Sequence, residues 1–349
     1  MAEAPRAYGV DPGQASLKTY VEDFVVEEVY EPEFSDDGEF FWLWVEKRGV
    51  DTPWLAKQLA QLLGVHPKAV TWSGLKDRHA LTSQWFCVHM PGKPQPNWNI
   101  SGEGWNIRRV ARHRKKLRIG THRYNRFKLR LRNFDGDPEA VKATVRAISD
   151  GGLPNYFGPQ RWGKNGSNLQ ACTSLLADGE RLPRFQRGMA LSAARAALFN
   201  QVLARRVADK NWDVALPGDI LCLRDSQSVF ANDEREETLS RVTACDLHPT
   251  GPMPGRSGKL VPDAEVADIE RKALAAFEVL VDGLCREGLS AERRALRIMP
   301  VELSLEIDAQ DLLLQFQLPR GCFATSLVRE LCEIRTSPNS ASDVKESSM

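Results

Sequence analysis

Strand-like hydrophobic patterns lie towards both ends of this chain of 349 residues, and helical patterns fill its middle. Residues 24–29 and 40–45 are rich in aromatic and β-branched side chains, and strand patterns return at 301–307 and 312–318. Within 191–210, by contrast, apolar residues recur at helical spacing. This order predicts a discontinuous α+β core whose two flanks pair with each other around a mostly helical insertion.

The boundaries of this insertion are set by the Gly/Pro-rich change of character just before Pro154 and by the return of strand patterns after Met299. We expect residues 1–153 and 300–336 to form the core, and residues 154–299 to form the insertion domain. The polar, Ser-rich stretch 337–349 is expected to be a disordered tail. A hydrophobic content of 42% is enough to pack both domains.

Local signals predict shorter elements. Pro32 and the turn residues 35–38 predict a hairpin between the first two strands. Thr52 is expected to cap a helix that has Pro53 in its first turn and ends at Gly64. Four more elements are expected: a strand at 85–88, a helix at 138–148, a Gly/Pro-rich loop at 248–262 and a long helix at 263–288.

Several classes of protein are disfavoured by what the sequence lacks. It begins without the apolar stretch of a secretory signal, and its apolar runs are too short to span a bilayer. Its seven cysteines form no C-x-x-C pair, which favours reduced thiols in a cytoplasmic protein without a metal site. The stretch 158–164 resembles a phosphate-binding loop but continues with Asn165 where Ser or Thr would bind magnesium, so no nucleotide cofactor is expected.

Charge is strongly segregated although the formal net charge is only +1. The segment 22–39 is acidic, whereas residues 106–132 hold twelve Lys or Arg and no Asp or Glu. A run of one sign favours contact with nucleic acid phosphates over the alternative, a solvated charged face. Within this run Phe127 could stack on a base, but alternation alone favours a core residue. The expected RNA-binding residues here are Arg112, Arg114, Lys115, Lys116 and Arg118.

Asp77 is the candidate reactive group. It stands between Lys76 and Arg78 in the stretch 74–84, and both cations favour its ionised form. A positioned, ionised carboxylate suits a nucleophile or a base. The pattern alone favours the alternative, a surface aspartate paired with Lys76 or Arg78.

Five stretches resemble motifs of the TruD family of tRNA pseudouridine synthases. The sequence G-L-K-D-R-H-A at 74–80, followed by Thr82 and Gln84, resembles the family signature around its aspartate. P-N-Y-F-G-P-Q-R at 154–161 resembles the family motif P-N-Y-F-G-x-Q-R. Residues 22–28, 191–200 and 318–331 also resemble family motifs, and all five occur in family order.

The resemblance implies a pseudouridine-synthase catalytic core with a mixed, mostly antiparallel sheet, interrupted by a family-specific insertion domain. It implies an isomerase, an intramolecular transferase, that converts a uridine of tRNA to pseudouridine, at position 13 in bacterial members. The reaction neither gains nor loses atoms, so no cofactor is expected. The implied partner is tRNA, and the protein is expected to act as a monomer in the cytoplasm.

The resemblance also implies roles for single residues. Asp77 would be the catalytic aspartate, Lys18 a basic partner in the active site, and Phe127 the ring that stacks on the target base. Asn125 would shape the same pocket, although Tyr124 stands where the family usually has Gly. Lys76 and Gln84 of the signature are counted among the substrate-binding residues, and Arg161 among the RNA-binding residues.

Three routes are open for the carboxylate of Asp77: attack on C1′, addition to C6 of the ring, or removal of the C2′ proton. Phe127 has no hydroxyl, so it cannot accept the C5 proton. The alternative function is a catalytically silent RNA-binding protein or RNA chaperone that reuses the same scaffold.

Overall fold

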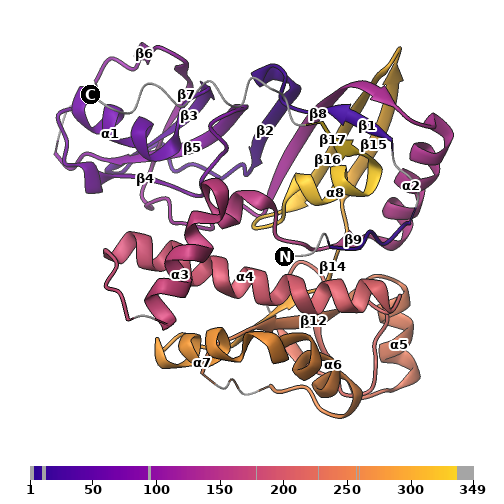
Figure 1. Ribbon diagram of the computed structural model, residues 1–349. Coiled ribbons are helices and arrows are strands. Elements are labelled where there is room, and N and C mark those ends of the chain that lie inside the picture. The colour runs from indigo at the N-terminus through magenta and orange to yellow at the C-terminus, as the bar shows by residue number, and fades with distance from the viewer. Residues whose placement is uncertain are drawn as a thin grey trace. The chain divides into compact units, whose positions relative to one another are not determined.

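The computed structural model describes residues 4–9, 13–92, 96–177, 179–226, 228–256, 258 and 260–335, so the tail expected at 337–349 lies outside the described residues. The chain forms two compact units (Figure 1). The sheet unit comprises Pro12–Val145, Val301–Gly321 and Cys332–Met349. The insertion unit comprises Met1–Asp11, Arg146–Pro300 and Cys322–Leu331.

The sheet unit is built on a sheet of eleven strands. Eight of them follow the order β15-β16-β8-β2-β5-β3-β7-β6, and the other three lie off this row: β1 pairs with β8 and β17, and β4 pairs with β5. The pairs β2–β5 and β1–β17 are parallel and the other pairs are antiparallel, which matches the predicted mixed, mostly antiparallel sheet. Strand β16 pairs with β8, so the flanks of the insertion pair as predicted. The strands are β1 (Gln14–Ser16), β2 (Phe24–Val29), β3 (Phe40–Arg48), β4 (Val70–Trp72), β5 (Leu81–His89), β6 (Ser101–Gly102), β7 (Trp105–His113), β8 (Tyr124–Asp135), β15 (Val301–Asp308), β16 (Asp311–Pro319) and β17 (Glu333–Ile334).

The predicted hairpin between β2 and β3 is wrong, because β5 lies between them. Val26 of β2 is paired with Thr82 of β5, and Leu43 of β3 is paired with Phe86 of β5. Most of β5 is buried, and its two edges bond to two different strands. The segment 30–39 only has to cross one intervening strand, a span of about 10 Å at the usual strand spacing.

Helix α1 (Thr52–Leu62) packs on one face of this sheet through Leu55 and Leu59. Its cap differs from the prediction by one residue. The carboxylate of Asp51 accepts the hydrogen bond from the backbone N–H of Trp54 at 3.3 Å. Thr52 is instead fully buried, and its hydroxyl donates to the side-chain oxygen of Gln84 at 3.0 Å. The first turn of α1 is thereby tied to β5.

The insertion unit contains helices and also a four-stranded sheet, order β11-β10-β12-β13, that the sequence did not indicate. The predicted loop at 248–262 begins as strand β12, whose Pro249 and Pro252 hid it from pattern analysis. The predicted long helix at 263–288 is two helices joined by a 3-10 turn. The elements here are α3 (Ser167–Ala177), α4 (Arg184–Ala208), α5 (Glu236–Thr243), α6 (Ala264–Leu274), α7 (Glu278–Arg286), β10 (Ile220–Leu223), β11 (Val229–Ala231), β12 (Leu247–Met253) and β13 (Glu292–Ala295).

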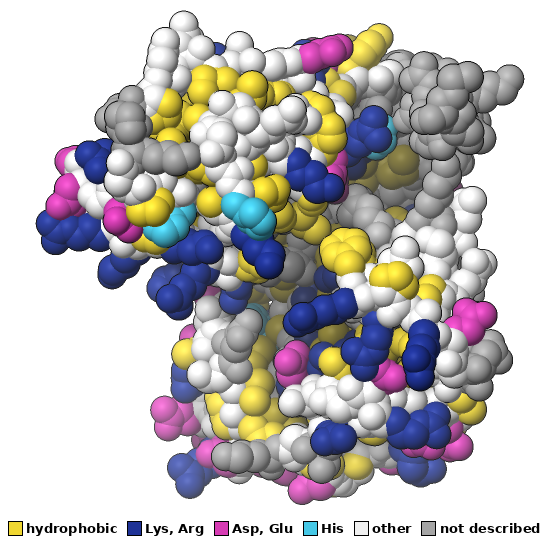
Figure 2. All heavy atoms as spheres, turned by 90° about the vertical axis from the view of Figure 1, so that its left-hand side faces the viewer, with side chains coloured by type: hydrophobic (Ala, Val, Ile, Leu, Met, Phe, Trp, Pro, Cys, Tyr) yellow, Lys and Arg dark blue, Asp and Glu magenta, His cyan; other side chains and the backbone are white. Residues whose placement is uncertain are grey.

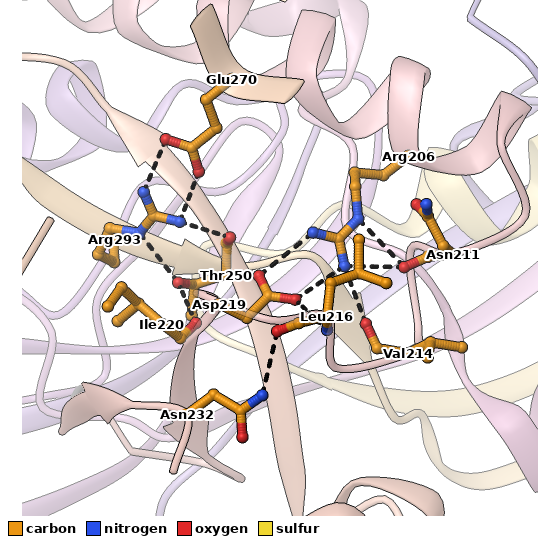
Figure 3. Close-up of polar contacts among 10 residues, drawn as sticks. All are labelled: Arg206, Asn211, Val214, Leu216, Asp219, Ile220, Asn232, Thr250, Glu270 and Arg293. Atoms are coloured by element: carbon orange, nitrogen blue, oxygen red, sulfur yellow. Dashed lines mark hydrogen bonds and ion pairs between the residues drawn. The ribbon is translucent and has the colours of Figure 1, made fainter. Parts of the chain in front are cut away.

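A buried network of charged residues fixes α4 against this smaller sheet (Figure 3). Arg206 of α4 is 1% exposed and forms an ion pair with Asp219, which is fully buried, at 3.0 Å. Arg293 of β13 pairs with Glu270 of α6 at 2.7 Å and also donates to the backbone carbonyl of Thr250. Each buried charge therefore has an opposite charge in contact, without which its burial would be costly.

The compact units do not coincide with the predicted domains 1–153, 154–299 and 300–336, because residues 146–153 and Cys322–Leu331, expected in the core, group with the insertion unit, whose longest segment ends at Pro300. They also differ at the beginning of the chain, because Met1–Asp11 groups with the insertion unit. Arg6 donates to the carbonyl of Arg329 at 2.7 Å, and the backbone N–H of Ala7 donates to Glu330 at 2.9 Å. Both acceptors belong to α8 (Ala324–Leu331), which is also part of the insertion unit. The remaining elements are α2 (Pro138–Gly151), β9 (Leu153–Pro154) and β14 (Arg297–Ile298).

Candidate active site

Lys18 and Asp77 lie in contact although 59 residues separate them. Lys18 follows β1, and Asp77 is in the loop between β4 and β5. The Lys18 ammonium donates to Oδ2 of Asp77 at 2.9 Å, and the two side chains are 23% and 32% exposed. The site thus holds a carboxylate that a substrate can reach, with a cation oriented on one of its oxygens.

Aromatic rings continue from this ion pair into the sheet. The ammonium of Lys18 lies 4.0 Å from the centre of the Phe24 ring, a cation–π contact. Phe24 meets the edge of Phe127 at a centroid distance of 6.2 Å, and Phe127 stacks on Phe316 at 5.3 Å. The structure therefore connects Lys18, Asp77 and Phe127 through Phe24, which the sequence did not single out.

Phe127 is only 6% exposed and packs as a core residue here, the interpretation that its alternating pattern favoured. Asn125 lies two residues before it in β8, so both side chains are on the same face of the sheet. The side-chain oxygen of Asn125 is buried and has no hydrogen-bond partner among the described residues. A buried acceptor without a donor is costly, and a bound ligand could supply that donor.

Lys18 also has a strained backbone. Its φ of 62° lies in the left-handed region, which costs a residue other than glycine about 1–2 kcal/mol. Such strain persists where the surrounding structure imposes it, and it is frequent at functional sites. In this conformation the Lys18 side chain lies between Asp77 and Phe24.

Lys76 and Gln84, predicted to bind substrate, are buried beneath the Asp77 loop. The Lys76 ammonium pairs with Glu28 at 2.9 Å, with the two side chains 4% and 0% exposed. Gln84 donates to the carbonyl of Gly74 at 2.9 Å and accepts from Thr52. Both residues use their polar atoms on the protein, so they support the loop from below. Lys76 consequently does not compensate Asp77 as its neighbouring position suggested.

The Glu28 carboxylate is the centre of this buried support. Its second oxygen accepts from the backbone N–H of Trp85 at 3.0 Å. Burial raises the pKa of Glu28, and the ion pair with Lys76 opposes that shift. His122 lies 3.5 Å from Glu28, and burial lowers the pKa of His122 to about 3, so this imidazole is neutral at physiological pH.

The middle of the basic segment 106–132 is joined to the Asp77 loop. The backbone N–H of Gly120 donates to the carbonyl of Ser73 at 2.7 Å, and the hydroxyl of Thr71 donates to the carbonyl of Leu117 at 2.9 Å. Ser73 and His122 are also hydrogen-bonded through their side chains. Residues 115–123 therefore lie beside the loop that holds the carboxylate.

The first half of the basic segment has acidic partners within the sheet unit, contrary to what its single-sign composition suggested. Because β7 is antiparallel to β3, its arginines meet acids from the acidic segment and from β3 itself. Arg112 instead donates to the carbonyl of Gly38 at 2.6 Å. The ion pairs are Arg108–Glu46 at 2.7 Å, Arg109–Glu31 at 3.1 Å and Arg114–Asp37 at 2.5 Å.

Lys115, Lys116 and Arg118 differ from those arginines. All three are exposed, and among the described residues no ion pair joins them to an acid. Figure 2 views the end of the sheet unit that carries α1 and β4, where Lys and Arg side chains form clusters on the surface. Lys115, Lys116 and Arg118 are therefore among the cations available to an external anion.

Arg161 belongs to the insertion unit, in the 3-10 helix Pro159–Trp162. Its guanidinium donates to the hydroxyl of Ser192 at 3.2 Å and lies 5.3 Å from the centre of the Phe157 ring. Burial lowers its pKa, and its Nε atom is buried without a hydrogen-bond partner among the described residues. Arg161 is therefore half-buried, packed against Phe157 and Ser192 of the insertion unit.

The described residues contain no cluster of three or more His, Cys, Asp or Glu side chains arranged to hold a metal ion. None of their helices combines the length and the apolar character needed to cross a lipid bilayer.

The comparisons with known proteins agree over nearly the whole chain. The family model of tRNA pseudouridine synthase D (TruD) matches residues 6–181 and 170–331. The tRNA pseudouridine synthase D of Pseudomonas fluorescens is 45% identical over 334 residues, which are 95% of this chain and 94% of that protein. The protein of the same name from Stutzerimonas stutzeri is 43% identical, covering 95% of this chain and 96% of its own length.

A crystal structure of a TruD protein from Methanosarcina mazei matches with a TM-score of 0.68 at 20% identity. The match covers 94% of this chain and 95% of the other, so the α+β fold with its insertion is shared over both units. With the full-length family match, the chain is a member of the tRNA pseudouridine synthase D family.

Proposed function

We propose that this protein is an isomerase that converts a uridine of tRNA to pseudouridine, with Asp77 as its catalytic residue. The observation that carries the proposal is the contact of Lys18 with Asp77, beside the rings of Phe24 and Phe127. Family membership and the names of the full-length relatives support the reaction and the substrate class.

The reaction breaks the C1′–N1 bond, turns the uracil and forms a bond between C1′ and C5. The proton on C5 is released and a proton is taken up at N1, so atoms and electrons balance without an external reagent. A carboxylate can take part by attack on C1′, by addition to C6 or by removal of the C2′ proton. In each route the ammonium of Lys18, 2.9 Å from Oδ2, fixes the orientation of the carboxylate.

The target base must leave its stack to reach this carboxylate. We assign Phe127 as an aromatic wall of the uracil pocket, backed by Phe316. The unpartnered oxygen of Asn125 would accept a hydrogen bond from N3–H of the uracil. Lys76 and Gln84 act through the loop that they support, and the half-buried Arg161 would contact the RNA through the exposed part of its side chain.

The finer parts of the proposal concern the substrate and setting. We propose position 13 of tRNA as the modified site, a monomer as the active form and the cytoplasm as the compartment. The test is to incubate the purified protein with unmodified tRNA transcripts and map pseudouridine by carbodiimide treatment and primer extension. A stop one nucleotide 3′ to position 13 is expected. A silent RNA-binding protein would give no stop at any position.

The cations after β7 are expected to bind the RNA backbone. Each phosphate contact adds about 0.7–0.9 to the slope of log affinity against log salt. The variant Lys115→Gln/Lys116→Gln should therefore bind tRNA more weakly and reduce this slope by between about 1 and 2. Fluorescence titrations at several salt concentrations measure both quantities.

The matched control is Arg108→Gln/Arg109→Gln, which removes the same charge from residues already paired with Glu46 and Glu31. It should leave the salt slope closer to that of the wild type. Equal slopes for the two double variants would show that the unpaired cations are not the RNA contact.

A further inference from the structure

We infer that Lys47 is a positioning residue for Asp77. It holds the main chain of the catalytic aspartate and places a positive charge beneath it. This inference deepens the proposed function and rests on it. The residue was not indicated as part of a site by the sequence. In β3 the alternation of Phe41, Leu43 and Val45 continues to Lys47, which places a charged side chain on the buried face of the strand.

The contacts of Lys47 join two segments of the site. Its side chain extends beneath the Asp77 loop, and the residue is only 1% exposed. The ammonium donates to the carbonyl of Val50 at 2.8 Å and to the backbone carbonyl of Asp77 at 3.2 Å. The first of these carbonyls precedes α1, so Lys47 connects the start of that helix to the backbone of the catalytic residue.

Burying an ammonium costs several kcal/mol unless other groups compensate it. Both hydrogen bonds of Lys47 are to carbonyl oxygens, and among the described residues no carboxylate lies within ion-pair distance of its ammonium. A residue of the same length without charge would avoid this cost. The placement of Lys47 under Asp77 is therefore best explained by a function of its positive charge and of its N–H donors.

The charged groups around Lys47 come from each element packed against it. Burial lowers the pKa of Lys47 to about 8. Asp51, before α1, and Asp77 both raise it, and Lys76, in the same loop as Asp77, lowers it. The ammonium consequently loses its proton as the pH rises through about 8, within the range in which enzyme assays are made.

Two consequences follow for catalysis. The hydrogen bond to the Asp77 carbonyl limits rotation of its backbone, which determines where the carboxylate points. The positive charge also favours an ionised carboxylate close by. Above about pH 8 the neutral amine still donates hydrogen bonds but no longer carries the charge, so the rate of isomerisation should fall while the fold persists.

The experiment compares pH profiles of kcat and KM, measured by steady-state pseudouridine formation, for the wild type, Lys47→Arg and Lys47→Met. Arginine keeps its charge and its donors throughout this range, so Lys47→Arg should remain active and lose the decline near pH 8. Lys47→Met should have a kcat lower by about 10- to 100-fold, with KM within about twofold and no such decline. Any protonation or deprotonation of the RNA affects all three proteins equally. The effect of residue 47 is therefore the difference between their pH profiles.

The control is Leu59→Ala, a cavity in the core under α1 that lowers stability without touching Asp77. It should lower Tm and leave the pH profile unchanged below its melting temperature. A Lys47→Arg profile identical to that of the wild type would overturn the inference, and so would wild-type kcat in folded Lys47→Met. If Lys47→Met does not fold, the arginine variant decides alone. Failure of the wild type to form pseudouridine would instead contradict the proposed function.

Discussion

Replacing Asp77 with asparagine is expected to lower the rate of pseudouridine formation by about 10⁴-fold or more, as loss of a group in covalent or proton-transfer chemistry does. The amide has nearly the same volume, but it can neither attack carbon nor accept a proton at neutral pH. Because we expect the cations after β7 rather than Asp77 to bind the RNA backbone, the Kd for tRNA should stay within about threefold. Single-turnover assays and binding titrations on the same preparation measure the two quantities.

Asp135→Asn makes the same exchange at an exposed position at the end of β8, where the side chain pairs with Arg335 at 3.4 Å. This variant should retain wild-type rate and affinity. Normal turnover by folded Asp77→Asn protein would remove Asp77 from the mechanism. A large loss of affinity with an unchanged rate would indicate that it binds RNA rather than reacts.

The variant Lys76→Met is expected to lose about 3–5 kcal/mol of unfolding free energy at pH 7, because it leaves the Glu28 carboxylate buried without its partner. Lys142→Met is the control: its pair with Glu139 is exposed, so its loss should be below about 1 kcal/mol. Urea denaturation of both variants measures these values. A loss for Lys76→Met as small as that of the control would show that the buried pair does not stabilise the Asp77 loop.

The same variant has a predicted pH dependence. Burial raises the pKa of Glu28 in the folded state, and removal of Lys76 removes the group that opposes this shift. In the folded variant Glu28 therefore binds a proton that it lacks in the unfolded chain. Lowering the pH from 7 towards 5 should consequently raise the unfolding free energy of Lys76→Met relative to that of the wild type. Adding Glu28→Gln should recover most of the loss at pH 7 and abolish this pH dependence. A pH-independent difference would contradict the assignment.

Much of the sheet unit could be predicted because its strands carry their own hydrophobic pattern. Strand β2 has the predicted bounds, and β15 and β16 lie where the sequence indicated strands at 301–307 and 312–318. The pairing of β2 with β5 could not be predicted in the same way. A turn signal such as that at 35–38 reports a local reversal of the chain, whereas the partner of a strand depends on segments far away in sequence.

Charges were the least predictable part of the site. Lys76 is adjacent to Asp77 in sequence, yet its side chain turns inwards to Glu28, because successive residues of an extended loop point to opposite sides. The arginines of β7 meet acids brought by the antiparallel pairing with β3. A single-sign run in sequence therefore does not establish an uncompensated surface; that requires knowledge of which strands become neighbours.

The ion pair of Lys18 with Asp77 illustrates the opposite case. No local pattern connects two residues separated by the whole of β2, β3, α1 and β4, and the family resemblance alone placed both in one site. The structure brings them to 2.9 Å. Lys47 has a local signal, because a lysine in phase with Leu43 and Val45 on the buried face of a strand indicates an internal charge.

The most direct test of the central claim is tritium release from tRNA labelled at C5 of uridine, in the presence of EDTA. Formation of the C1′–C5 bond displaces the C5 hydrogen, so wild-type protein should release close to one tritium for each modified tRNA, and Asp77→Asn protein should release none above background. Equal release by the two proteins, or no release by the wild type, would contradict an aspartate-dependent uridine isomerase.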